Sequence, residues 1–167
     1  MLYDTIGRGY AAQRVPDPRI AAQLVAALGD AATVINVGAG AGSYEPRDRS
    51  VVAVEPSMTM IRQRPPGSPP AVQATAERLP IRDSAAQASM AILTVHHWRD
   101  RSAGLNELAR VATDRVAILT WDPEGPEFWL THEYFPAMVA RDRERFPTVR
   151  EISRVIGSTR VETVPVP

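Results

Sequence analysis

The sequence contains no cysteine and no lysine. Without cysteine the chain can form no disulfide, no thiolate zinc site and no cysteine nucleophile. No apolar run approaches the roughly 20 residues that cross a bilayer, and the N-terminus lacks a signal-peptide pattern, so we expect a soluble cytoplasmic protein. The 19 basic and 19 acidic side chains cancel, which leaves no broad field to attract nucleic acid or an anionic membrane.

Length and periodicity predict a single α/β domain. The 167 residues, 44% of them apolar, suffice for one hydrophobic core. Short β-branched runs alternate with helical patterns, as in a Rossmann-like, doubly wound, mostly parallel sheet with helices on both faces. The predicted strands are residues 34–37, 51–54, 71–74, 89–95 and 116–121. The predicted helices are residues 18–28, 57–61, 101–112 and 148–156, with another in the aromatic stretch 128–139.

A glycine-rich turn follows the first predicted strand. Its glycines are at positions 38, 40 and 42, and the next apolar run ends on Glu55, 17 positions after the first glycine. Glycine lets the backbone come close to a ligand, and an acid at the end of the second strand can accept hydrogen bonds from both ribose hydroxyls. The pattern predicts a nucleoside cofactor across the carboxyl ends of two neighbouring strands.

Ser43 and Pro46 argue against a dinucleotide as this cofactor. Dinucleotide turns favour G-x-G-x-x-G before a helix whose N-terminus holds the pyrophosphate. Here serine stands at the position of the third glycine, and Pro46 cuts the following helix short. An NAD-dependent oxidoreductase is therefore disfavoured. A further alternative is that the glycines only form a turn and bind no ligand.

Four motifs, in order, make residues 1 to about 121 resemble the class I S-adenosylmethionine-dependent methyltransferases, specifically the type 11 small-molecule subgroup. They are NVGAGAG at 36–42, VAVEPSM at 52–58, AERLP at 76–80, and LTVHHWRD at 93–100, continued by LNELARV at 105–111. The resemblance implies S-adenosyl-L-methionine as cofactor and methyl transfer to an oxygen, nitrogen or carbon atom of a small molecule. The alternative is a non-catalytic S-adenosylmethionine- or S-adenosylhomocysteine-binding protein with a degenerate form of this fold.

The resemblance also implies which residues bind the cofactor. Those expected at the methionine moiety are Gly38, Ala39, Gly40, Gly42, Ala91 and Ile92. Those expected at the ribose and adenine are Glu55, Pro56, Met58, Thr75, Ala76 and Glu77. Tyr10 and Arg14 would close over the cofactor from an N-terminal segment, residues 1–16. The core would then span 17–121, and 122–167 would cover the substrate.

The chain departs from the family pattern at several positions. Asn36 stands where the first motif often has an acid, Thr75 where the adenine segment often has one, and Gln87 at an acidic position before the fourth strand. The fold usually ends with a sixth strand and an antiparallel seventh strand. Here only residues 160–166 look like a strand, so we expect the seventh to be absent. The remaining strand would pair beside the fifth strand or with a second copy in a homodimer.

Four side chains are weak candidates for acid–base chemistry, and the sequence does not identify the base. They are His96, His97, His132 and Tyr3. If the fourth strand stays extended, two adjacent histidines point in opposite directions, so at most one faces the cofactor. Each could instead have a purely structural role. The aromatic stretch 128–139 would either line an apolar substrate pocket or pack into the core. Three histidines without clustered acids predict no metal site.

Overall fold

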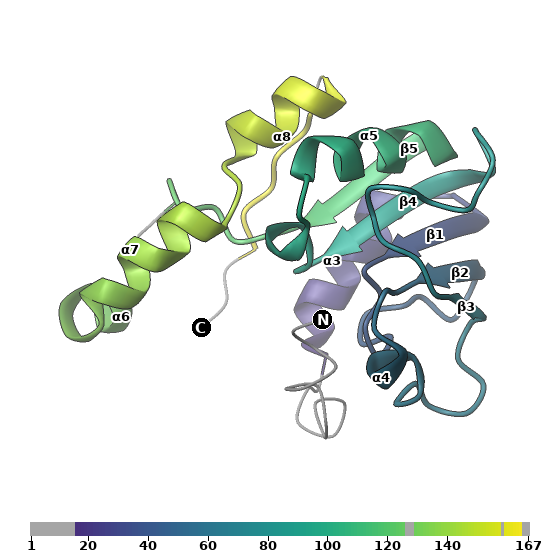
Figure 1. The fold of residues 1–167 in the computed structure, drawn as a ribbon, viewed down its shortest axis with the longest axis horizontal. Coiled ribbons are helices and arrows are strands. Elements are labelled where there is room, and N and C mark those ends of the chain that lie inside the picture. The colour runs from purple at the N-terminus through teal and green to yellow at the C-terminus, as the bar shows by residue number, and fades with distance from the viewer. Residues whose placement is uncertain (1–15, 126–128, 158, 165–167) are drawn as a thin grey trace.

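Five parallel strands form the centre of the molecule (Figure 1). The computed structural model describes residues 16–125, 129–157 and 159–164. The strands are β1 (Thr33–Val37), β2 (Ser50–Val54), β3 (Ala71–Val72), β4 (Ala86–Ile92) and β5 (Ala112–Leu119), in the order β3-β2-β1-β4-β5. All four neighbouring pairs are parallel. The strand order reverses between β1 and β4, and ligands bind doubly wound sheets outside the carboxyl ends at such a point. The predicted fold class is confirmed.

Helices cover both faces of the sheet. They are α3 (Pro18–Leu28), α4 (Met58–Ile61), α5 (Arg101–Val111), α6 (Trp129–Tyr134), α7 (Pro136–Arg145) and α8 (Val149–Ile156), with a 3-10 turn η1 (Val95–His97). Four of these helices begin at a side chain that accepts a hydrogen bond from a backbone N–H in the first turn, which stabilises the helix start. These residues are Asp17, Ser57, Asp100 and Thr148.

The apolar side chains form two layers, one on each face of the sheet. On one face Leu28 of α3 packs with strand residues that include Val34 and Met90. On the other face, Leu105 and Leu108 of α5 and Ile152 of α8 pack with the strand residues that alternate with these along the chain. Figure 1 shows α5 and α8 together on one side of the sheet and α3 on the other. Successive residues of a strand thus pack against helices on opposite faces of the sheet. Because both faces are packed, the carboxyl ends of the strands are held in fixed positions.

Three strands differ clearly from the prediction: β3 ends at residue 72 instead of 74, and β4 and β5 differ at both ends. Strand β4 begins at residue 86 and ends at residue 92, because Leu93 has a positive φ of 50° that breaks the extended backbone. The next residues form η1, so the assumption that the histidine pair continues a strand is wrong. Strand β5 begins at residue 112, directly after α5, and ends at residue 119; it pairs with β4 from Ala112 to Leu119, with a register shift between Ala86 and Ala88 of β4.

The aromatic stretch forms α6 and α7, which extend away from the sheet (Figure 1). Trp129, Tyr134, Phe135 and Met138 are exposed, so the described part of this stretch does not pack into the core. Residues 159–164 form no strand, which corrects that part of the predicted strand 160–166; residues 165–167 lie outside the described residues. Within the described residues, β5 pairs only with β4, and the homodimer through this edge stays a prediction.

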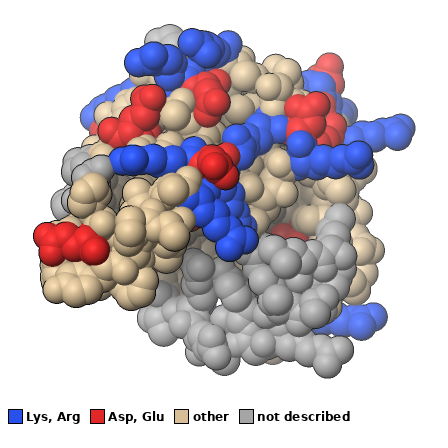
Figure 2. Space-filling model, turned by 60° about the vertical axis from the view of Figure 1, so that its left-hand side comes forward, with Lys and Arg blue, Asp and Glu red and all other residues tan. Residues whose placement is uncertain are grey.

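Charged side chains of both signs lie next to each other on the face of the molecule that Figure 2 shows. The whole chain has a formal net charge of zero. In the described part of the chain, no helix has the length and apolar character needed to cross a membrane. The same residues contain no cluster of histidine and acidic side chains that could hold a metal ion.

Candidate cofactor site

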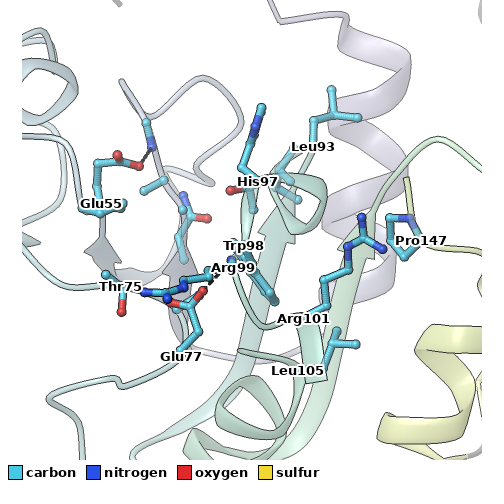
Figure 3. A pocket seen from close by; sticks show the side chains of 18 of the residues that line it. Glu55, Thr75, Glu77, Leu93, His97, Trp98, Arg99, Arg101, Leu105 and Pro147 are labelled. Carbon is cyan, nitrogen blue, oxygen red and sulfur yellow. Dashed lines mark hydrogen bonds between the residues drawn. The ribbon is translucent and has the colours of Figure 1, made fainter. Parts of the chain in front are cut away.

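A cavity of about 1370 Å³ opens at the carboxyl ends of the central strands (Figure 3). Its walls come from the turn after β1, the end of β2, residues 75–77, the end of β4, and the segment from η1 into α5. Residues of α8 close the far side. The cavity therefore lies where the strand order predicts a ligand site.

The glycine turn approaches the cavity as bare backbone. Gly38, Gly40 and Gly42 have positive φ angles of 71°, 54° and 88°, which side-chain-bearing residues rarely adopt. A Cβ at Gly38 would lie 2.1 Å from Oγ1 of Thr94, so no larger residue fits there. The N–H groups of Gly38 and Ala39 donate to the carbonyl of Val54 at 2.8 and 3.1 Å. Strand β2 thus fixes the conformation of the turn.

The carboxylate of Glu55 is held by two backbone groups. Its Oε2 accepts a hydrogen bond from the N–H of Gly40 at 2.8 Å, and its Oε1 accepts one from the N–H of Ser57 at 2.9 Å. The residue is only 5% exposed, yet it lines the cavity. A carboxylate can accept about four hydrogen bonds, which suits it to a vicinal diol. Figure 3 shows Glu55 at one end of the cavity, bonded to the turn.

Glu77 joins the 75–77 segment to the start of α5. Its Oε1 accepts hydrogen bonds from the N–H groups of Arg99 and Asp100 at 2.8 and 3.4 Å. Burial opposes ionisation of this carboxyl, but hydrogen bonds from backbone N–H groups and from Thr75 lower the pKa of Glu77 below its ordinary value. These hydrogen bonds attach residues 75–77 to the part of the cavity wall that η1 and Trp98 form.

Most of the residues expected at the cofactor come together around this cavity. Those that line it are Gly38, Ala39, Gly40, Glu55, Pro56, Thr75, Ala76, Glu77 and Ile92. Gly42, Met58 and Ala91 do not line it. Met58 is exposed at the start of α4. Met60, two residues later in the same helix, is buried and lines the cavity instead. Tyr3, Tyr10 and Arg14 lie outside the described residues.

Of the histidine candidates, His97 lines the cavity, whereas His96 and His132 do not. Arg145 Nη2 lies 2.8 Å from Nδ1 of His97. Burial, and then the positive charge of Arg145, lower the pKa of His97 to about 4. The ring of His96 packs between His97 and Phe146, with centroid distances of 3.9 and 4.0 Å. His132 is exposed on α6.

Residues 122–167 were expected to cover the substrate, but the individual residues of the wall formed by α5 and α8 were not predicted. The cavity residues of this wall are Arg101, Ser102, Leu105, Pro147, Glu151, Arg154 and Val155. Helices α5 and α8 are separated by almost 40 residues of sequence, and they meet through the apolar contact of Leu105 and Leu108 with Ile152. The capping signal at Thr148 predicts the start of α8 but not the surface that it covers.

The profile of a protein family described as a methyltransferase domain matches residues 35–119, just over half of the chain. The chain belongs to this family. Its cofactor is therefore S-adenosylmethionine, as the motifs predicted. The matched region of this methyltransferase domain contains the glycine turn, Glu55, residues 75–77 and η1.

Solved structures give the same fold for this methyltransferase domain. A methyltransferase from an antibiotic biosynthesis pathway of Anabaena variabilis is 28% identical, with a TM-score of 0.75 over 86% of this chain and 61% of its own. A methyltransferase of Thermotoga maritima is 19% identical, with a TM-score of 0.69 over 92% and 76%. Geranyl diphosphate C-methyltransferase of Streptomyces coelicolor is 19% identical, with a TM-score of 0.64 over 83% and 57%.

The present chain thus spans about three fifths of the length of the Anabaena protein. No curated protein sequence matches it significantly. The two neighbours below 25% identity share the fold with this methyltransferase domain.

Proposed function

We propose that this chain binds S-adenosylmethionine in the cavity and transfers its methyl group to an oxygen, nitrogen or carbon atom of a small molecule. The observation that carries the proposal is the carboxylate of Glu55, buried between the glycine turn and the start of α4 while facing the cavity. This carboxylate would accept hydrogen bonds from both ribose hydroxyls. The Anabaena neighbour, from an antibiotic biosynthesis pathway, supports a small-molecule acceptor.

The remaining cavity residues fit the other parts of this cofactor. The turn at Gly38 and Gly40 leaves room for the methionine moiety beside bare backbone. Asn36 Oδ1 is buried, and no described residue donates a hydrogen bond to it, so a donor from the ligand would satisfy it. Pro56 and Met60 provide apolar contact for the adenine next to residues 75–77. The Streptomyces neighbour holds S-adenosylhomocysteine, which supports the same class of ligand here.

When bound, the cofactor supplies a methyl group on a sulfonium, an activated electrophile with a good leaving group. The residues of the cavity then have to hold the acceptor in line and exclude water. Arginine can only donate, so His97 Nδ1 accepts from Arg145 and the ring proton lies on Nε2. Any hydrogen bond between Nε2 and the methyl acceptor would then be one that His97 donates, and in this tautomer Nε2 is not available as a general base.

The acceptor would lie beyond His97, against the wall of α5 and α8. This part of the cavity combines the apolar side chains of Leu105 and Val155 with the guanidinium groups of Arg101 and Arg154. Such a surface suits a small molecule with an apolar body and a polar or anionic group.

Thermal shift with S-adenosylmethionine, S-adenosylhomocysteine and NAD tests the cofactor directly, because only ligands of the native state raise the melting temperature. We expect the first two to stabilise the protein and NAD to have no effect. Stabilisation by NAD alone would overturn the proposal. Turnover on a broad panel of small-molecule acceptors separates the enzyme from a protein that binds the cofactor without catalysis. For that second function we expect tight binding and no methylated product.

Calorimetry on the Glu55→Ala variant tests the site itself. Loss of a charge-assisted bond to the ribose should weaken binding of S-adenosylmethionine at least about tenfold. The variant also loses the acceptor for the N–H of Gly40, so its unfolding free energy is measured in parallel. A variant that remains folded and binds with unchanged affinity would remove Glu55 from the cofactor site.

A further inference from the structure

A buried ion pair stands where the crossover from β1 to β2 would ordinarily contain a helix. Residues 38–49, all of them described, form no helix. Instead, Glu45 Oε2 lies 2.6 Å from Nη2 of Arg64, and the two side chains are only 4% and 5% exposed. Arg64 Nη2 also donates to the carbonyl of Pro69 at 3.1 Å. The pair therefore ties the loop after the glycine turn to the segment that follows α4.

Glycine at position 42 makes room for this pair. A Cβ there would lie 2.8 Å from Glu45 Oε2 and 3.1 Å from Arg64 Nη1. Gly42 does not line the cavity, so its lack of a side chain serves the ion pair and not direct contact with the ligand. Charged groups this deeply buried are costly unless they are paired, which makes the position of Glu45 well defined.

The other oxygen of Glu45 connects the pair to the cavity. Asn36 Nδ2 donates a hydrogen bond to Glu45 Oε1 at 3.0 Å. Asn36 lies on β1, is buried, and lines the cavity. Because its NH₂ group is directed to Glu45, its Oδ1 is the atom left to meet a ligand, and no described residue donates to that atom. The carboxylate of Glu45 thus holds the Asn36 amide with its NH₂ group toward Glu45 and its oxygen toward the cavity.

We propose that Glu45 and Arg64 are positioning residues, which hold the Asn36 amide with its oxygen toward the ammonium group of S-adenosylmethionine. This inference rests on the function proposed above. A carboxylate at the position of Asn36 would need no such orientation, because both of its oxygens accept. An asparagine in its place can present either a donor or an acceptor. Glu45 selects the acceptor, and Arg64 holds Glu45 in place.

The Glu45→Gln variant tests this orientation. Arg64 is a charged donor and will take the oxygen of the introduced amide, which turns the NH₂ of that amide toward Asn36. The Asn36 amide must then flip, so that its own NH₂ faces the ammonium group. We expect calorimetry to show at least about a tenfold loss of affinity for S-adenosylmethionine. Affinity for 5′-methylthioadenosine, which lacks the ammonium and carboxylate, should change less than about twofold.

A double variant reverses the polarity of the same hydrogen bond. When Asn36→Asp is combined with Glu45→Gln, the NH₂ of the introduced glutamine donates to one oxygen of the introduced aspartate. The other carboxylate oxygen is left to face the ammonium group. We expect this double variant to recover most of the affinity that Glu45→Gln loses. Asn36→Asp alone is no test of the orientation, because two carboxylates about 3 Å apart cannot both remain ionised, and a protonated aspartic acid can donate to Glu45 as the asparagine does.

The matched control is Glu107→Gln, which removes a carboxylate from a less deeply buried pair with arginine that does not line the cavity. Glu107 Oε1 lies 2.6 Å from Nε of Arg110. This variant should leave the ratio of the two ligand affinities unchanged. Equal losses for both ligands in Glu45→Gln, or no recovery in the double variant, would show Glu45 to be only a structural anchor and overturn the inference. If the unaltered protein binds neither S-adenosylmethionine nor S-adenosylhomocysteine, the proposed function fails first.

Discussion

The indole of Trp98 packs against α5 at Gly104, where a Cβ would lie 2.4 Å from the indole Cε3 atom. Glycine in a helix interior costs about 1 kcal/mol relative to alanine, so Gly104 serves to admit the ring. The contact fixes the segment that runs from the end of η1 into α5, on which His97 and Arg99 face the cavity (Figure 3). The packing of one helix thereby sets the shape of the cavity wall.

We expect Gly104→Ala to destabilise the protein by about 1–3 kcal/mol, because overpacking against the ring outweighs the better helix propensity of alanine. Urea unfolding measures this change. Affinity for S-adenosylmethionine should fall as well, since Trp98 must move. Ala109→Gly, at an exposed position of α5, should cost about 1 kcal/mol without changing affinity. A Gly104→Ala protein more stable than the original would show that the ring is not in contact with α5.

Gly38→Ala should destabilise the protein more strongly than Gly67→Ala. Both glycines have a positive φ, 71° and 81°. A Cβ at Gly38 would meet Thr94, whereas nothing lies within 4 Å of a Cβ at Gly67. The backbone strain common to both costs about 1 kcal/mol, and the clash adds about 1–3 kcal/mol at Gly38 only. Urea unfolding of the two variants isolates the clash, and equal losses would contradict the close approach of Thr94.

Acid should destabilise the protein through His97. Its pKa is about 4 in the fold, against 6.5 as the ordinary value of a histidine. Between these two pH values the unfolded chain binds a proton that the folded chain does not, so stability falls as the pH is lowered through this window. Titration of the imidazole signals by nuclear magnetic resonance gives the pKa directly, and a value near 6.5 would contradict the burial of this ring.

Arg145→Gln should raise the pKa of His97 without restoring it to 6.5. The amide of glutamine can still donate to Nδ1, while the positive charge is lost. Burial is the larger cause of the shift, and it stays. Imidazole titration of the variant measures the difference, with His97→Gln used to assign the signals among the three histidines. An unchanged pKa would mean that Arg145 does not lie beside the ring in solution.

The parts of the site that the sequence predicted are those encoded locally. A strand, a glycine turn and a terminal acid are contiguous patterns, and their pairing in a parallel sheet brought Gly38, Gly40 and Glu55 together as expected. The end of β4 was missed because Leu93 adopts a conformation that its residue type does not favour. The pairs of Arg145 with His97 and of Arg64 with Glu45 join distant segments, and only the folded chain shows them.

The aromatic stretch after β5 was expected either in the core or at a substrate pocket, and the exposure of α6 suggests a test. Trp129 is 60% exposed, whereas Leu108 of α5 is fully buried in the core. Trp129→Ala should therefore change the unfolding free energy by less than about 0.5 kcal/mol, while Leu108→Ala should cost about 2–5 kcal/mol. Urea unfolding compares the two. Removal of an exposed indole leaves no cavity, so only a small loss is expected. A loss above about 2 kcal/mol for Trp129→Ala would therefore show that α6 packs against the domain in solution.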